Sequence, residues 1–152
     1  MSLLRSRGRI AITLAIIGTV CACRVNSYVL APGSEHGWVT VEEGNSSCAA
    51  QRIDQWRTTF AISRTRIACT STPTHQGWEF NRYYLAQPDG SAIRLGADEL
   101  IHRRSFFAVG QLGSPCFYSG TQFFFGTLQE LSTSQPVAFS SEYKLEHHSE
   151  CP

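Results

Sequence analysis

Alternation of hydrophobic and polar positions is the main structural signal along the chain. Residues 37–43 place Val39 and Val41 on one face and Thr40 and Glu42 on the other. A period of two residues is typical of a half-buried β-strand. The same pattern, or a short apolar run, predicts strands over residues 27–30, 37–43, 56–62, 78–86, 92–95, 105–109 and 122–128.

Turn signals between these segments favour an all-β fold. Pro88-Asp89-Gly90 joins two predicted strands as a hairpin turn, because proline presets φ and glycine tolerates positive φ. Phe123-Phe124-Phe125 is apolar on both faces, so it indicates a central, covered strand. Short helices are expected at 48–54 and 97–103. The sequence therefore predicts a small antiparallel β-sandwich or barrel-like domain.

The first 22 residues indicate a targeting segment outside this fold. Arg5, Arg7 and Arg9 precede a short apolar run over residues 10–20. As a helix that run would reach about 16 Å, against a hydrocarbon core of about 30 Å. A basic start before a short apolar run is typical of a secretory signal peptide. A buried N-terminal helix and a short signal anchor are the alternatives.

The end of this segment resembles the lipobox of bacterial lipoproteins. Val20 matches the aliphatic position, Ala22 the small one and Cys23 the modified cysteine, while Cys21 stands where a small residue is usual. The resemblance implies cleavage after Ala22 and multiple acylation of Cys23, with palmitate among the acyl groups. Cys21 is the competing site. The absence of aspartate at position 24, which holds Arg24, favours the outer membrane, facing the periplasm, in a Gram-negative source.

Length and charge limit the classes of function. The chain has 152 residues, which suits one domain. Without residues 1–22 it keeps 10 basic and 12 acidic residues, a net charge of −2. We therefore expect no polybasic patch for an anionic bilayer and no nucleic-acid surface, and attachment to the membrane would depend on lipid.

The expected organisation is a signal peptide (1–22), a lipidated linker (23–27), a β-rich domain (28–131) and a polar tail (132–152).

Four cysteines remain once Cys21 is removed and Cys23 is lipidated, and an even number in an oxidising compartment predicts two disulfides. Three connectivities are open. We choose Cys48–Cys69, which brackets one strand, and Cys116–Cys151, which would fasten the polar tail.

A second resemblance spans much of the mature chain. Tyr28, Pro32-Gly33 and Gly37-Trp38-Val39 resemble the opening of a group of small bacterial envelope lipoproteins of unknown function. Features of that group follow in the same order at Thr70-Ser71, Gly77-Trp78, Tyr83-Tyr84, Asp89-Gly90 and Phe124-Phe125-Gly126-Thr127. The resemblance implies a fold and a compartment, but no activity.

Motifs for catalysis and metal binding are missing from the sequence. Neither Gly-x-Ser-x-Gly nor Cys-x-x-Cys occurs. His147 and His148 are adjacent rather than spaced for one metal, and with Glu150 they predict a solvated tail. The isolated histidines, which we interpret as surface or hydrogen-bonded groups, are His36, His75 and His102. We predict no catalytic residue, no metal and no cofactor.

Tryptophans and one Ser-Gly step are the candidate binding residues. Trp38, Trp56 and Trp78 could form an aromatic platform, although we expect at least two in the core. Ser119-Gly120 resembles the loop by which small envelope lipoproteins inhibit lysozyme. The candidates are thus Trp38, Trp78, Ser119 and Gly120. The sequence favours a non-enzymatic envelope lipoprotein that binds an envelope protein or glycan; an inhibitor of a cell-wall hydrolase and a small hydrolase are the alternatives.

Overall fold

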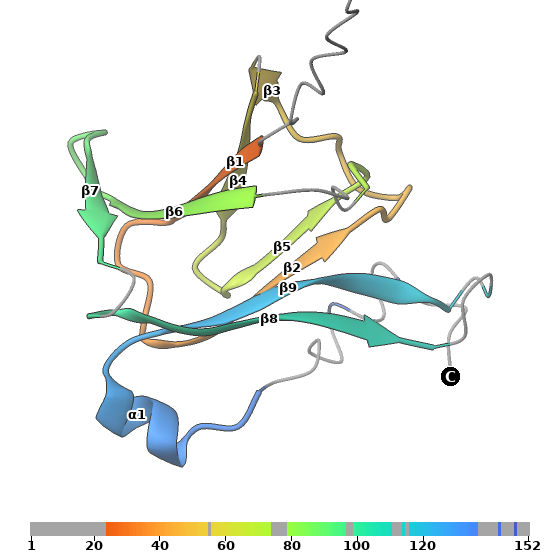
Figure 1. Cartoon of the computed structure of the whole chain (residues 1–152). Helices are drawn as coiled ribbons and strands as arrows, with labels where there is room; N and C mark the ends of the chain where they lie inside the picture. The colour runs from red at the N-terminus through yellow and green to blue at the C-terminus, as the bar shows by residue number, and fades with distance from the viewer. Residues whose placement is uncertain are drawn as a thin grey trace, which may run out of the picture.

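The protein is all-β, as the sequence predicts (Figure 1). The computed structural model describes residues 24–54, 56–73, 79–96, 99–110, 114, 116–136, 143 and 148. The predicted signal peptide and Cys23 lie outside the described residues. The elements are β1 (Arg24–Leu30), β2 (Gly37–Glu43), β3 (Ile53–Asp54), β4 (Arg57–Ile62), β5 (Ile67–Thr70), β6 (Glu79–Ala86), β7 (Ala92–Leu95), β8 (Ile101–Val109), β9 (Tyr118–Phe125) and α1 (Leu128–Thr133).

The strands form two facing sheets. Sheet A has the order β3-β4-β1-β6-β7, and sheet B has the order β5-β2-β9-β8. Within the described residues the sheets do not close into a barrel, so the sandwich is confirmed. They are mixed rather than purely antiparallel, because β1 runs parallel to β4 and β6, and β2 runs parallel to β5. The chain leaves sheet A after β1, forms β2 in sheet B and then returns to sheet A, where it forms β4. It reverses direction twice on this path, so β1 and β4 run parallel.

Aromatic rings from both sheets fill the core. Tyr28 of β1 stacks between Phe60 of β4 and Tyr83 of β6, with ring centroids 5.0 and 5.3 Å apart. Phe123 of β9 meets Tyr28 and Tyr83 edge-on from sheet B, at 5.3 and 4.8 Å. Each such aromatic pair contributes about 0.5–1.5 kcal/mol beyond the area that it buries. These four rings hold the sheets together.

The triple phenylalanine segment forms a covered central strand, as predicted. β9 lies between β2 and β8, and its three phenylalanines are buried. Phe124 points away from the core between the sheets and packs against Trp38 and Leu131. Because Leu131 belongs to α1, the short helix covers the outer face of sheet B (Figure 1).

Two predicted helices and one predicted linker are absent from the described structure. The helices expected at 48–54 and 97–103 do not form in the described residues, since residues 53–54 are β3 and β8 begins at Ile101. Strand pairing overrides their weak helical preference. Residues 24–27, expected as linker, belong to β1, because they pair with both β4 and β6.

Helix α1 replaces the end of the predicted strand 122–128 and the start of the predicted tail. Thr127 is its N-cap: the Thr127 hydroxyl accepts a hydrogen bond from the Glu130 backbone, and the Glu130 carboxylate accepts one from the Thr127 backbone. This reciprocal pattern is a capping box. Thr-x-x-Glu was therefore the sequence signal that could have revealed the helix.

Candidate functional site

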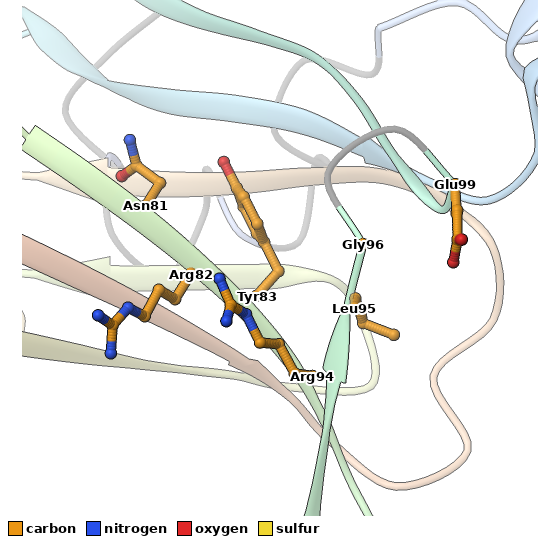
Figure 2. A pocket seen from close by; sticks show the side chains of 7 residues that line it. All are labelled: Asn81, Arg82, Tyr83, Arg94, Leu95, Gly96 and Glu99. Carbon is orange, nitrogen blue, oxygen red and sulfur yellow. The ribbon is translucent and has the colours of Figure 1, made fainter.

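A pocket of 360 Å³ lies where β7 stops pairing with β6 (Figure 2). β7 pairs with residues 83–86 of β6, and among the described residues the edge of β6 before Tyr83 has no neighbour on that side. Asn81 and Tyr83 point from β6 toward sheet B, whereas Arg82 points to the opposite side (Figure 2). The pocket therefore reaches from the open edge of β6 toward the space between the two sheets, where Asn81 and Tyr83 point.

A second pocket, of 460 Å³, adjoins the first and shares Asn81, Arg82 and Arg94 with it. Its other lining residues are Val25, Trp56 and Phe80. Together these side chains offer guanidinium groups for anions and rings for apolar or planar groups. Trp56 lies outside β4 and is half exposed, so it is not one of the tryptophans in the core.

Arginines gather around this second pocket, on the face of sheet A that points away from sheet B. Arg57 and Phe80 are the register partners of Val25, and Arg82 is the partner of Ser27. Arg94 of β7 also lines the pocket. We call Trp56, Arg57, Phe80, Arg82 and Arg94 the basic aromatic patch. Strand register collects these three arginines on one face, even though the net charge without residues 1–22 is −2.

Burial sets the state of two core phenols, Tyr28 and Tyr83, of which Tyr83 lines the first pocket. It raises the pKa of Tyr83 to about 12, an effect that Arg104 opposes and Glu79 reinforces. Burial likewise raises the pKa of Tyr28 above its ordinary value. Burial alone would lower the pKa of Arg104, but Tyr28, Tyr83 and Glu79 raise it overall. Arg104 Nη2 donates to Glu79 Oε2 at 2.9 Å. Both phenols therefore stay neutral near pH 7 and are suited to hydrogen bonding rather than acid–base chemistry.

The C-terminal segment contributes a buried polar network on the far side of sheet B. Glu42, at 1% exposure, accepts hydrogen bonds from Tyr143 and lies against His148. The expectation that His148 is solvated is wrong: alternation along β2 places the Glu42 carboxylate on the outer face of the sheet, and His148 covers it. His147 and Glu150 lie outside the described residues.

Another histidine is also engaged by a carboxylate. His36 Nδ1 lies 2.8 Å from Glu130 Oε2, and its ring meets Phe125 edge-on at 4.9 Å. This contact joins the β1–β2 connection to α1, and confirms His36 as a hydrogen-bonded group. His102 lies on β8 and is partly buried, while His75 lies outside the described residues.

The predicted binding residues do not gather in one site. Trp38 is buried against Phe124 and Leu131, so it offers no open platform. Ser119 and Gly120 are not in a loop: both lie within β9, where Gly120 pairs with Glu42 of β2. Trp78 lies outside the described residues. The Ser-Gly step therefore acts in strand packing, and the geometry gives no support to its use as an inhibitor loop.

The cysteines agree with the predicted pairing as far as they are described. A disulfide joins Cys48 to Cys69 of β5, with Cα atoms 5.8 Å apart, which confirms this pair. Cys116 is also disulfide-bonded. Cys151 lies outside the described residues, so the pair Cys116–Cys151 stays a prediction.

Metal-binding and membrane-spanning features were sought in the same part of the chain. Among the described residues, no group of three or more His, Cys, Asp or Glu side chains is arranged to hold a metal ion. No helix of the described part is long and apolar enough to cross a membrane.

The fold is similar to a crystal structure of a Bacillus anthracis protein described as a candidate lipoprotein. The TM-score is 0.57 at 16% sequence identity, over 82% of this chain and 88% of the other. At this identity the likeness establishes the fold. No family model matches the chain, and no curated protein matches it.

Proposed function

We propose that the protein is a bacterial envelope lipoprotein, anchored through Cys23, whose sandwich is a non-enzymatic module that binds an envelope protein or glycan. The fold of the Bacillus anthracis lipoprotein candidate supports this proposal. So does the lipobox-like Val20-Cys21-Ala22-Cys23 segment after a basic and apolar start. In a Gram-negative source, Arg24 in place of aspartate favours the outer membrane, facing the periplasm.

The position of Cys23 carries the proposal. Arg24, the next residue, is the first of β1, a strand with neighbours on both sides in sheet A. Because the predicted signal peptide ends before β1 begins, its removal takes away no strand residue of sheet A. Cleavage at Cys23 therefore leaves a complete domain with the lipid attached at its first residue.

A binding role suits the polar groups better than catalysis. Two carboxylate–histidine contacts in the described part of the chain, Glu130 with His36 and Glu42 with His148, join distant segments and do not line either of the two pockets described above. The two pockets around Arg82 and Arg94 present cations and rings instead. This lining is suited to non-covalent contact with anionic groups rather than to proton transfer.

Fatty-acid labelling tests the anchor. The full chain, expressed in a bacterial host with labelled palmitate, should incorporate label and shift in mass. Cys23→Ala should abolish both, whereas Cys21→Ala, the matched control two residues away, should retain them. Labelling that survives Cys23→Ala at the wild-type level would overturn the assignment.

A further inference from the structure

Exposed apolar side chains surround the point where the described chain begins. Trp56 is 49% exposed, Phe80 60% and Ile53 49%. The backbone N–H of Val25 donates to the Trp56 carbonyl at 2.9 Å, and Phe80 is the register partner of Val25. Strand neighbours lie about 5 Å apart, and two residues of chain span at most about 7 Å. Trp56 and Phe80 therefore lie beside the first residues of β1, the strand that follows Cys23 in the sequence.

The charges around these rings are mainly positive. Arg57 and Arg82 are on the same face of sheet A as Phe80, and Arg94 extends to the same pocket. The Arg57 guanidinium lies 5.7 Å from the centre of the Trp56 ring. Of the nearby acids, Asp54 is the register partner of Arg57, and Glu79 is paired with Arg104. An excess of cations over acids remains.

We propose that the basic aromatic patch, with Ile53, is the surface by which the domain sits on the phospholipid bilayer. The inference rests on the lipid anchor at Cys23 proposed above. Aromatic rings partition to the membrane interface, and arginines bind anionic headgroups. Because β1 begins directly after Cys23, the lipid holds the domain beside the bilayer with this end toward it. The bilayer thus covers rings that would otherwise remain in water.

Location distinguishes this patch from other exposed apolar residues. Leu128 is 65% exposed but belongs to α1, which lies on the outer side of sheet B, away from sheet A and the start of β1 (Figure 1). Bilayer contact at the patch therefore predicts that Phe80 meets acyl chains and Leu128 does not. The pair supplies a matched control.

Quenching by brominated acyl chains tests this arrangement. The lipidated full chain is placed in vesicles of phosphatidylethanolamine and phosphatidylglycerol, with or without bromine on the acyl chains, and tryptophan fluorescence is compared. In a Trp78→Phe background, tryptophan fluorescence should be quenched, and the further change Trp56→Phe should remove most of the quenching. Trp38→Phe, which changes a buried ring, should leave it nearly unchanged. In the Trp56→Phe background, Phe80→Trp should restore quenching and Leu128→Trp should not.

Two outcomes overturn the inference: quenching that Trp56→Phe leaves intact, or equal quenching of tryptophan at positions 80 and 128. Quenching that does not depend on Trp56 is also expected if a protein or glycan, rather than the bilayer, covers the basic aromatic patch. Label incorporation is measured on the same preparations. Missing label at Cys23 means that the anchor proposal has failed, whereas full label without Trp56-dependent quenching means that only the bilayer contact has failed.

Discussion

The Nε2 atom of His148 lies 2.9 Å from Oε1 of Glu42, and this contact ties the C-terminal segment to the middle of sheet B. The two side chains are 7% and 1% exposed. The hydroxyl of Tyr143 donates to the other carboxylate oxygen of Glu42 at 2.5 Å. The buried carboxylate of Glu42 thus depends on Tyr143 and His148, which follow it by 101 and 106 residues in the sequence.

Removing the imidazole should therefore cost much of the stability. We expect His148→Ala to lower the free energy of unfolding by about 3 kcal/mol, because it leaves the Glu42 carboxylate buried with one partner fewer. Urea denaturation measures this. Combining it with Glu42→Gln should cost less than the sum of the single changes, since the unpaired charge is then gone. A loss below about 0.5 kcal/mol for His148→Ala, the range of surface substitutions, contradicts the prediction.

Glu130 should titrate at unusually low pH. The Thr127 backbone N–H, followed by His36 and the Thr127 hydroxyl, lowers the pKa of Glu130 from 4.5 to about 2. Because the folded pKa lies below the unfolded one, the contribution to stability is full above pH 4.5 and is lost as the pH falls through 2. Carbon-13 NMR of the side-chain carboxyl should show the low midpoint. A midpoint at or above pH 4 would show that the cap and the His36 contact do not persist in solution.

Gly120 should not tolerate a side chain. A Cβ placed there would lie 1.9 Å from the Val41 carbonyl oxygen, a backbone atom of the neighbouring strand. Gly120→Ala must displace β9 from β2, and we expect a loss of about 1–3 kcal/mol, as for overpacked cores. Gly96→Ala is the control, since its Cβ would meet the flexible side chain of Glu99 at 3.1 Å. Equal thermal stability of the two variants would count against this account.

The Cys48–Cys69 disulfide should be a major source of stability. Its sequence separation is 21, for which the loop-entropy estimate is about 3 kcal/mol. The variant with both cysteines changed to serine should unfold at correspondingly lower urea concentration. Non-reducing peptide mapping of the wild type checks the connectivity, and it also tests Cys116–Cys151. A peptide linking Cys48 or Cys69 to Cys116 is the contrary result.

Local pattern was enough for most strands. Alternation predicted β2 and the turn Pro88-Asp89-Gly90 predicted β7, both with the bounds that the structure has, and the triple phenylalanine predicted a covered strand. The alternation of β2 persists although both of its faces are buried, because Val39 and Val41 face the core between the sheets, whereas Thr40 and Glu42 have polar partners on the outer face. The sequence could not reveal that β1 runs parallel to β4 and β6. The relative direction of two strands depends on which sheet the chain enters after each loop. A loop has no hydrophobic alternation from which this choice could be predicted.

The candidate site depended still more on tertiary structure. The sequence by itself determined an all-β domain behind a lipobox-like cysteine, and it left three disulfide connectivities open, among which locality favoured Cys48–Cys69. Trp56, Phe80 and Arg94 come from three separate segments, and only strand register brings them around one pocket. The burial of Glu42 under His148 likewise requires the chain end to return over sheet B. Contacts between residues close along the chain follow from the local sequence pattern. A surface patch or a buried pair joins distant segments, so it forms only when the sheets pack together.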